Sequence, residues 1–177
     1  MAPFGTLKVV IAPNPGLNQV CEPCTPGDKS LHKLANKMLN TMYKNSGCGL
    51  AGPQVGVEKR IVVIDCGEIE KEPFVLVNPE IIELQGVPET SAEGCLSLPG
   101  ISVNIARQPY ARVRYFDLEG KECEIAGDGL LGRCLQHEID HLDGKTLLES
   151  CSPIDRIKAL KEYQEALARG ARPGDTE

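Results

Sequence analysis

Two histidines and a glutamate occur in the chain with the spacing of a metal-binding helix. Residues 137–141 read His-Glu-x-x-His, and they use two of the only three histidines in the sequence. On a helix, His137 and His141 lie about 40° apart around the axis, so both imidazoles can bind one metal ion. Glu138 lies beside them and need not be a ligand, so its carboxylate can transfer the proton of a water molecule. The pattern therefore predicts a hydrolytic metal site.

A solvent-exposed helix with two surface histidines is the structural alternative. Three apolar residues, Leu135, Ile139 and Leu142, flank the histidines and indicate that this helix is largely buried. Neutral imidazoles in a buried setting need partners. We therefore favour the metal site over the exposed helix.

The third metal ligand has two candidates. A hydrolytic site usually has three protein ligands and an open position for water. The three-histidine form of the motif is excluded because Leu147 stands six residues after His141. Glu162 on the last predicted helix would give a metalloprotease, whereas the thiolate of Cys95 would give a Cys-His-His site. The residues by themselves leave this choice open.

The elements that position these residues follow from the hydrophobic pattern. A first helix opens at Asp28, ends near Gly47 and has the apolar positions Leu31, Leu34, Ala35, Met38, Leu39 and Met42. A Gly-rich loop over 47–54 then leads into a strand over 60–65. Further short strands are expected at 74–78, 81–85, 111–116 and 122–125.

Two more helices are predicted near the end of the chain. Asp128 opens the one that carries the His-Glu-x-x-His motif, and Pro153 stands at the first position of the last one. The expected apolar side of the last helix consists of Ile154, Ile157, Leu160, Tyr163 and Leu167. Strands in the middle with helices near both ends predict an α+β fold.

The composition limits the class of protein. The 177 residues are 41% hydrophobic and 25% charged, as in globular domains. We find no repeat or internal boundary, so we expect one catalytic domain over 1–170 and a frayed polar tail over 171–177. The net charge of -6 and the 4% aromatic content disfavour DNA and membrane partners.

The eight cysteines are expected to be reduced. No apolar stretch approaches the roughly 18 residues of a membrane span, and the N-terminus lacks the features of a secretion signal. We therefore expect a cytoplasmic protein, in which cysteines pack as small hydrophobes or act as ligands. Cys21 and Cys24 are interpreted as ordinary thiols, because no second Cys-x-x-Cys pair accompanies them.

Three segments together resemble the peptide deformylase family. They are residues 47–56 (GCGLAGPQVG), 93–97 (EGCLS) and 136–144 (QHEIDHLDG), and they occur in the order found in that family. The resemblance extends from about residue 7 to about residue 166. It implies an α+β fold of short, mostly antiparallel sheets packed around the central motif-bearing helix, with one helix near each terminus.

The resemblance also implies a catalytic mechanism. Cys95, His137 and His141 would bind one divalent metal, natively Fe(II), with Ni, Co or Zn as substitutes. Ligand chemistry alone would favour zinc. A metal-bound hydroxide would attack the formyl carbon of N-formylmethionyl nascent peptides, with release of formate. Glu138 would act as general base and acid, while the Gln54 side chain and the backbone N–H of Leu96 stabilise the oxyanion.

The substrate site and the partners follow from the same resemblance. The residues expected to contact the substrate are Cys48, Gly49, Glu93, Gly94, Leu130 and Cys134, with the methionine side chain in an apolar pocket. Three residues depart from the usual family pattern: Gly52 replaces an alanine, Cys48 an aliphatic residue and Ser102 an arginine. A monomer is expected, with ribosome docking through the basic residues of the last helix, Arg156, Lys158, Lys161 and Arg169.

Overall fold

The structure, a computed structural model that describes residues 5–175, consists of two antiparallel sheets around one central helix. The helices are α1 (Ser30–Lys44), α2 (Gly129–Leu142), α3 (Leu147–Ser150) and α4 (Pro153–Ala168), with 3-10 turns η1 (Pro15–Asn18) and η2 (Gly52–Val55). The strands are β1 (Gly49–Ala51), β2 (Ile61–Ile64), β3 (Phe74–Gln85), β4 (Glu89–Gly94), β5 (Ser102–Arg107), β6 (Tyr110–Phe116) and β7 (Glu122–Gly127). The predicted α+β class is confirmed.

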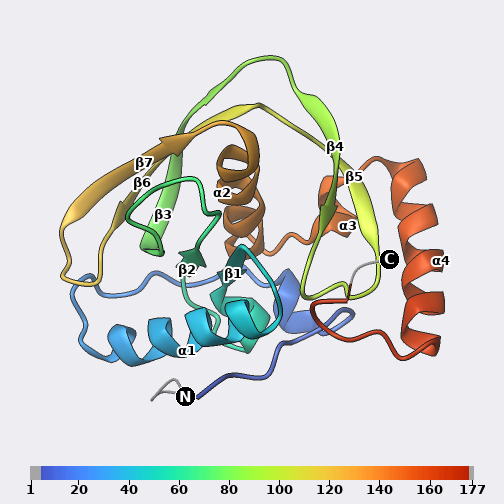
Figure 1. Ribbon diagram of the computed structural model, residues 1–177, viewed down its shortest axis with the longest axis horizontal. Coiled ribbons are helices and arrows are strands. Elements are labelled where there is room, and N and C mark those ends of the chain that lie inside the picture. The colour runs from blue at the N-terminus through green and yellow to red at the C-terminus, as the bar shows by residue number, and fades with distance from the viewer. Residues whose placement is uncertain (1–4, 176–177) are drawn as a thin grey trace.

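The central helix α2 lies between the two sheets. The larger sheet has the order β1-β2-β3-β6-β7, and the smaller sheet pairs β4 with β5. Figure 1 shows α2 between these sheets, with α1 beneath β1 and β2 and α4 on the outer side of β5. Among residues 5–175, none of the helices combines the length and the apolarity that crossing a membrane requires.

The larger sheet is covered on both faces. In β2, Val62 and Ile64 pack with α2, whereas Ile61 and Val63 pack with α1. This explains why β2 is a continuous apolar run, since alternate side chains of a strand point to opposite faces. At Gly132 of α2, an added Cβ would lie 2.7 Å from the carbonyl oxygens of Gly127 and Pro109, so glycine permits the close approach of helix and sheet.

The predicted elements are largely correct, with three differences. The segments 74–78 and 81–85 form one strand, β3, whose alternation is interrupted by register shifts next to Asn78, a residue with positive φ. β1 lies within the expected Gly-rich loop. β4, β5 and α3 were not predicted, because β4 is polar and mostly exposed on both faces and α3 is a single turn. The second and last helices begin after Asp128 and Ser152, as expected.

The predicted apolar face of α4 is only partly correct: Tyr163 is buried and Leu167 packs against the same cluster, but Ile154, Ile157 and Leu160 are exposed. The residues that α4 buries are Ala159, Tyr163 and Ala166, which pack with Val103 and Ile105 of β5. Ile154 and Ile157 are instead 81% and 73% exposed. The two small alanines let the helix lie close to the sheet, and a count of large apolar residues overlooks them.

The expected fraying of the tail is also wrong for the described residues 171–175. The Gly100 N–H donates to the carbonyl oxygen of Asp175, and the Arg172 N–H donates to the Asp175 carboxylate at 2.7 Å. The tail therefore folds back toward the turn that precedes β5. Residues 176 and 177, also part of the predicted tail, lie outside the described residues.

Tyr163 offers a test of which face of α4 is buried. Its hydroxyl donates to the carbonyl oxygen of Ala12 at 2.6 Å. Tyr163→Phe leaves this buried acceptor without its donor, so we expect the free energy of unfolding to fall by about 1–3 kcal/mol. Ile157→Ala on the exposed face should change it by less than about 0.5 kcal/mol. Urea unfolding measures both, and equal effects of the two variants would contradict the packing.

Candidate active site

The structure brings the three predicted metal ligands together. His137 and His141 extend from one face of α2, and Cys95 lies in the turn that follows β4. The Cys95 Sγ lies 3.4 Å from His141 Nε2, which lies 3.3 Å from His137 Nε2. The three ligand atoms all lie within 4.8 Å of one another. One sulfur and two nitrogens therefore converge on a single point.

This donor set fits a divalent metal. Cysteine sulfur and histidine nitrogen bind such ions at about 2.0–2.3 Å, which accounts for ligand atoms at these separations. His141 is only 1% exposed. Burial lowers the pKa of His141 well below its ordinary value, with a smaller contribution from His137, so that its imidazole is neutral. Neutral imidazole is the form that binds metals.

Glu162, the alternative third ligand, lies elsewhere. Its carboxylate pairs with Lys158 of the same helix at 3.6 Å, and it lines a small pocket with Ser102 and Val103. Within residues 5–175, the group of ligand atoms around the two histidines is completed by Cys95 and does not include Glu162.

Glu138 lies beside the ligands with a carboxylate that is almost entirely buried. The residue is 4% exposed, and burial raises its pKa to about 7, although the nearby His137 opposes this. Among the described residues, its Oε2 atom has no hydrogen-bond partner. A buried carboxylate with a free oxygen next to a metal-binding group is suited to accept and return a proton.

Gln54 is held in place by the loop that carries it. Its Oε1 accepts the backbone N–H of Ala51 at 2.9 Å, and its Nε2 donates to Ser97 Oγ at 3.3 Å and to Cys95 Sγ at 3.5 Å. An added Cβ at Gly52 would lie 2.6 Å from the carbonyl oxygens of both Val57 and Lys59. The absence of a side chain at Gly52 thus lets the loop pack tightly against these carbonyl groups.

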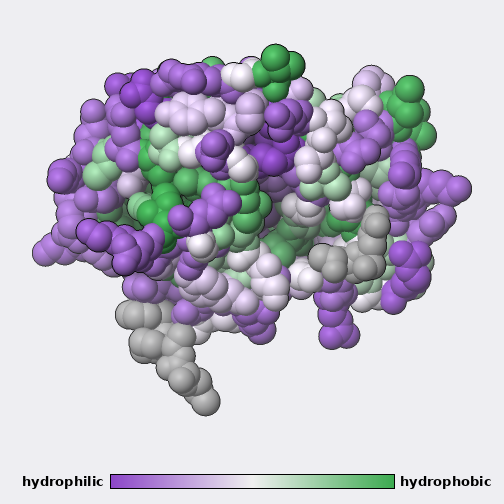
Figure 2. All heavy atoms as spheres, turned by 45° about the horizontal axis from the view of Figure 1, so that its top comes forward, coloured by the Kyte–Doolittle hydropathy of each residue, from purple (hydrophilic) through white to green (hydrophobic). Residues whose placement is uncertain are grey.

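One pocket of about 330 Å³ contains the site. The predicted residues that line it are Cys48, Gly49, Gln54, Glu93, Gly94, Cys95, Leu96, Leu130, Cys134, His137 and Glu138. His141 is buried and is not among the lining residues. Figure 2 shows hydrophobic side chains gathered in the middle of this face and mostly hydrophilic ones around the rim. Asn45, Gly174 and Asp175 also line the pocket, and nothing in their local sequence indicates this.

Gly49 is a position where the pocket wall leaves no room for a side chain. A Cβ atom there would collide with Glu138 Oε1 and lie 2.8 Å from Cys134 Sγ. The absence of a side chain therefore keeps both the carboxylate and the backbone of β1 accessible from the pocket.

Comparison with known proteins agrees with this geometry. The family model described as polypeptide deformylase matches residues 6–157. A peptide deformylase of Hydrogenovibrio crunogenus is 42% identical over 165 residues, which are 93% of this chain and 97% of that protein. The chain belongs to the polypeptide deformylase family. The predicted family is confirmed, and with it the prediction of a deformylating hydrolase.

Solved deformylase structures share the fold. The crystal structure of a deformylase from Legionella pneumophila superposes with a TM-score of 0.87 at 40% identity, covering 93% of this chain and 97% of that one. A deformylase from Synechococcus elongatus, solved in complex with actinonin, has a TM-score of 0.82 at 36% identity and covers 93% and 87%. The roles of individual residues in this family member stay predictions.

A buried ion-pair network supports the deformylase ligand group. The Glu93 carboxylate accepts hydrogen bonds from Arg107 at 2.7 and 3.0 Å and contacts His137 Nδ1 at 3.0 Å. Burial opposes ionisation of Glu93, but the bonds from His137 and Arg107 lower its pKa to about 2. A carboxylate at Nδ1 fixes the orientation of the ring and leaves Nε2 for the metal. Glu93 was predicted only as a substrate contact.

The same hydrogen bonds determine the charge of His137. Burial lowers the pKa of this imidazole, but the bonds to Cys95 and Glu93 outweigh burial and raise the pKa well above its ordinary value. A metal ion at Nε2 would take the place of that proton, and Glu93 would keep its hydrogen bond to the other nitrogen.

Arg107 is a buried charged residue beside the site that sequence reasoning missed. Its side chain is 7% exposed and also donates to Asp140 of α2 at 2.8 Å. It follows Val103 and Ile105 at alternate, inward-facing positions of β5. A charged residue in an alternating apolar run could have revealed it, but β5 was not predicted.

Removing Arg107 should therefore destabilise the protein. Arg107→Ala removes two hydrogen bonds from the buried Glu93 carboxylate and the ion pair with Asp140, and we expect a loss of about 3–5 kcal/mol in the free energy of unfolding. Arg114→Ala, which breaks the exposed pair with Glu80, is the matched control and should cause no measurable change. The comparison uses urea unfolding of both variants. If Arg107→Ala is as stable as its control, the network does not stabilise the fold.

Proposed function

We propose that this deformylase holds one divalent ion through Cys95, His137 and His141 and removes the formyl group from N-formylmethionyl ends of nascent polypeptides. The observation that carries the proposal is the convergence of these ligand atoms with Glu138 and Gln54 in one pocket. The native ion is proposed to be Fe(II). When bound, such an ion supplies a Lewis acid that polarises a carbonyl and lowers the pKa of water.

Glu138 is proposed to carry the proton of the reaction. Hydrolysis adds a hydroxyl group to the formyl carbon and a proton to the amide nitrogen that leaves. The free Oε2 atom of Glu138 can accept the proton of the attacking water and then deliver it to that nitrogen. Its burial excludes bulk water, which would otherwise exchange the proton.

Gln54 and Leu96 are proposed to stabilise the oxyanion. The Gln54 Nε2 points at Cys95 Sγ, so its N–H groups face the metal-binding group, and the bond from Ala51 keeps this amide from turning over. Leu96 follows Cys95 directly and lines the same pocket. Donors that are already in place when charge develops lower the barrier without having to reorganise.

The substrate is proposed to bind as an extended chain along β1. This strand is at the edge of the larger sheet, so the backbone of Gly49 is free to pair with a peptide. The methionine side chain would then enter the pocket between Cys48, Leu130 and Cys134, with Glu93 and Gly94 on the opposite wall.

Glu138 gives the main test of this function. Glu138→Ala removes the proton carrier but none of the proposed ligands, so formate release from a formylmethionyl peptide should fall by about 10²–10⁴-fold. The metal content, measured by elemental analysis of anaerobic samples, should stay at one ion per chain. Undiminished release in a metal-loaded variant would refute the role of Glu138. No release by the metal-loaded native chain would refute the proposed function.

A second pair of variants tests the ligand set. Cys95→Ala removes one of three ligands, and we expect the metal to be lost on dialysis, because structural and catalytic sites need their full set of donors. Glu162→Ala should keep the metal, since its carboxylate pairs with Lys158. Elemental analysis of the native chain, isolated without oxygen, identifies the ion. Metal loss in Glu162→Ala with retention in Cys95→Ala would favour the protease arrangement.

We further propose that the reaction takes place in the cytoplasm, on a monomer that docks at the ribosome through α4. The support is the outer face of this helix, where Arg156 and Lys158 have side chains that are 52% and 70% exposed. Lys161 and Arg169 are also exposed. Such a basic face can neutralise RNA phosphates even though the net charge of the chain is negative.

A further inference from the structure

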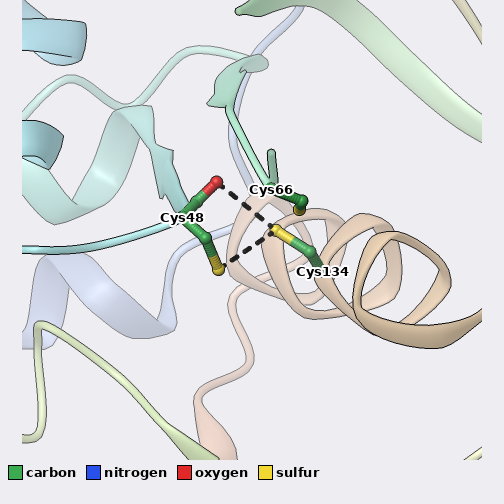
Figure 3. A group of neighbouring side chains, drawn as sticks. All are labelled: Cys48, Cys66 and Cys134. Carbon is green, nitrogen blue, oxygen red and sulfur yellow. Dashed lines mark hydrogen bonds between the residues drawn. The ribbon is translucent and has the colours of Figure 1, made fainter. Parts of the chain in front are cut away.

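Three cysteines from distant parts of the chain form a cluster next to the active site. Cys48 directly precedes β1, Cys66 follows the end of β2, and Cys134 lies on α2. Figure 3 shows the three side chains directed toward one another. The Sγ atoms of Cys48 and Cys134 are 4.0 Å apart, and all three sulfurs lie within 4.8 Å of one another.

The backbone holds this cluster in place. β1 pairs with β2, and the pairing continues one step further because the Asp65 N–H donates to the carbonyl oxygen of Cys48 at 2.9 Å. Cys66 is the next residue, so Cys48 and Cys66 lie near each other just beyond the paired ends of β1 and β2. α2 packs across β1 and β2 and brings Cys134 to them.

The sulfur separations match those of a shared ion. Three sulfurs that bind one ion at about 2.3 Å in a trigonal arrangement lie about 4.0 Å apart. Since all three sulfurs lie within 4.8 Å of one another, only small side-chain movements are needed to reach that arrangement. Access is available as well, since Cys48 and Cys134 line the active-site pocket.

The composition of the cluster selects the kind of ion. Within residues 5–175, the group consists of three cysteine sulfurs, with no histidine, aspartate or glutamate side chain among its ligand atoms. Thiolates prefer soft ions such as Cu(I), whereas a structural zinc site is closed by four protein ligands. A three-sulfur site without a fourth donor suits Cu(I), which accepts three-coordination.

We propose that Cys48, Cys66 and Cys134 form a second metal site, which binds one Cu(I) ion in the wall of the active-site pocket. Cys66 has no part in the proposed deformylation, and it does not line the pocket. The proposal concerns binding alone, so it does not depend on the catalytic roles proposed above.

The test uses the full-length chain, loaded with Ni(II) at the Cys95 site and kept anaerobic with a phosphine reductant. Cu(I) is titrated in against a competing chelator, and copper and nickel per chain are measured. X-ray absorption at the copper edge identifies the neighbouring atoms. Cys66→Ala removes one ligand without touching the pocket, and Cys151→Ala, another half-buried cysteine in a different core cluster, is the matched control.

We expect one copper ion per native chain, with sulfur neighbours only and with nickel retained. Cys66→Ala should lose this copper, while Cys151→Ala should keep it. The proposal would be overturned if the native chain took up no copper, or if Cys66→Ala took up as much as the native chain. The three cysteines would then be thiols that only pack in the core. Nitrogen neighbours with loss of nickel would overturn it too, because copper would then occupy the Cys95 site. Formate release by Cys66→Ala should equal that of the native chain, which checks its fold separately.

Discussion

The buried carboxylate of Glu93 connects the two parts of the site, the smaller sheet that leads to Cys95 and the helix α2 that carries both histidines. It lies near the end of β4, contacts His137 and Arg133 of α2, and accepts two hydrogen bonds from Arg107 of β5. The smaller sheet is therefore attached to the helix through charges with little access to water. Such charges are stable only with their partners in place, so the geometry of the network tolerates little change.

This attachment explains the position of Cys95. The thiol lies two residues after Glu93, in the turn that ends β4, and so the contact that fixes Glu93 on α2 also sets the distance from Cys95 to the two imidazoles. The histidines come from one helical face, a local feature of the sequence, whereas the sulfur comes from a separate sheet. A Cys-His-His set thus depends on how the smaller sheet packs on α2. The ion pairs of Arg107 with Glu93 and with Asp140 hold the sheet and the helix in this position.

The sequence predicts what is local and what is periodic. The helices that begin after Asp128 and Ser152 have clear capping residues and apolar spacing, and the spacing of His137 and His141 follows from the helix itself. The strand β4 could not be found in this way, because a polar strand with one partner has no hydrophobic pattern. The buried face of α4 was missed for a related reason, since close packing selects small residues such as Ala159. The residues alone left Cys95 and Glu162 as alternatives for the third ligand, and only the family resemblance favoured Cys95.

The middle of α2 places two kinds of ligand along one wall of the pocket. Cys134 precedes His137 by three residues and Glu138 by four, so all three lie on neighbouring positions of the same helical face. An added Cβ at Gly49 would touch both Glu138 and Cys134, which shows how closely the carboxylate and the sulfur cluster approach each other. A mixed set of nitrogen and sulfur suits a catalytic divalent ion, and a set of sulfurs alone suits a soft one. If both proposed sites bind their ions, the same helix would discriminate between them by donor type, with part of each group lining one pocket.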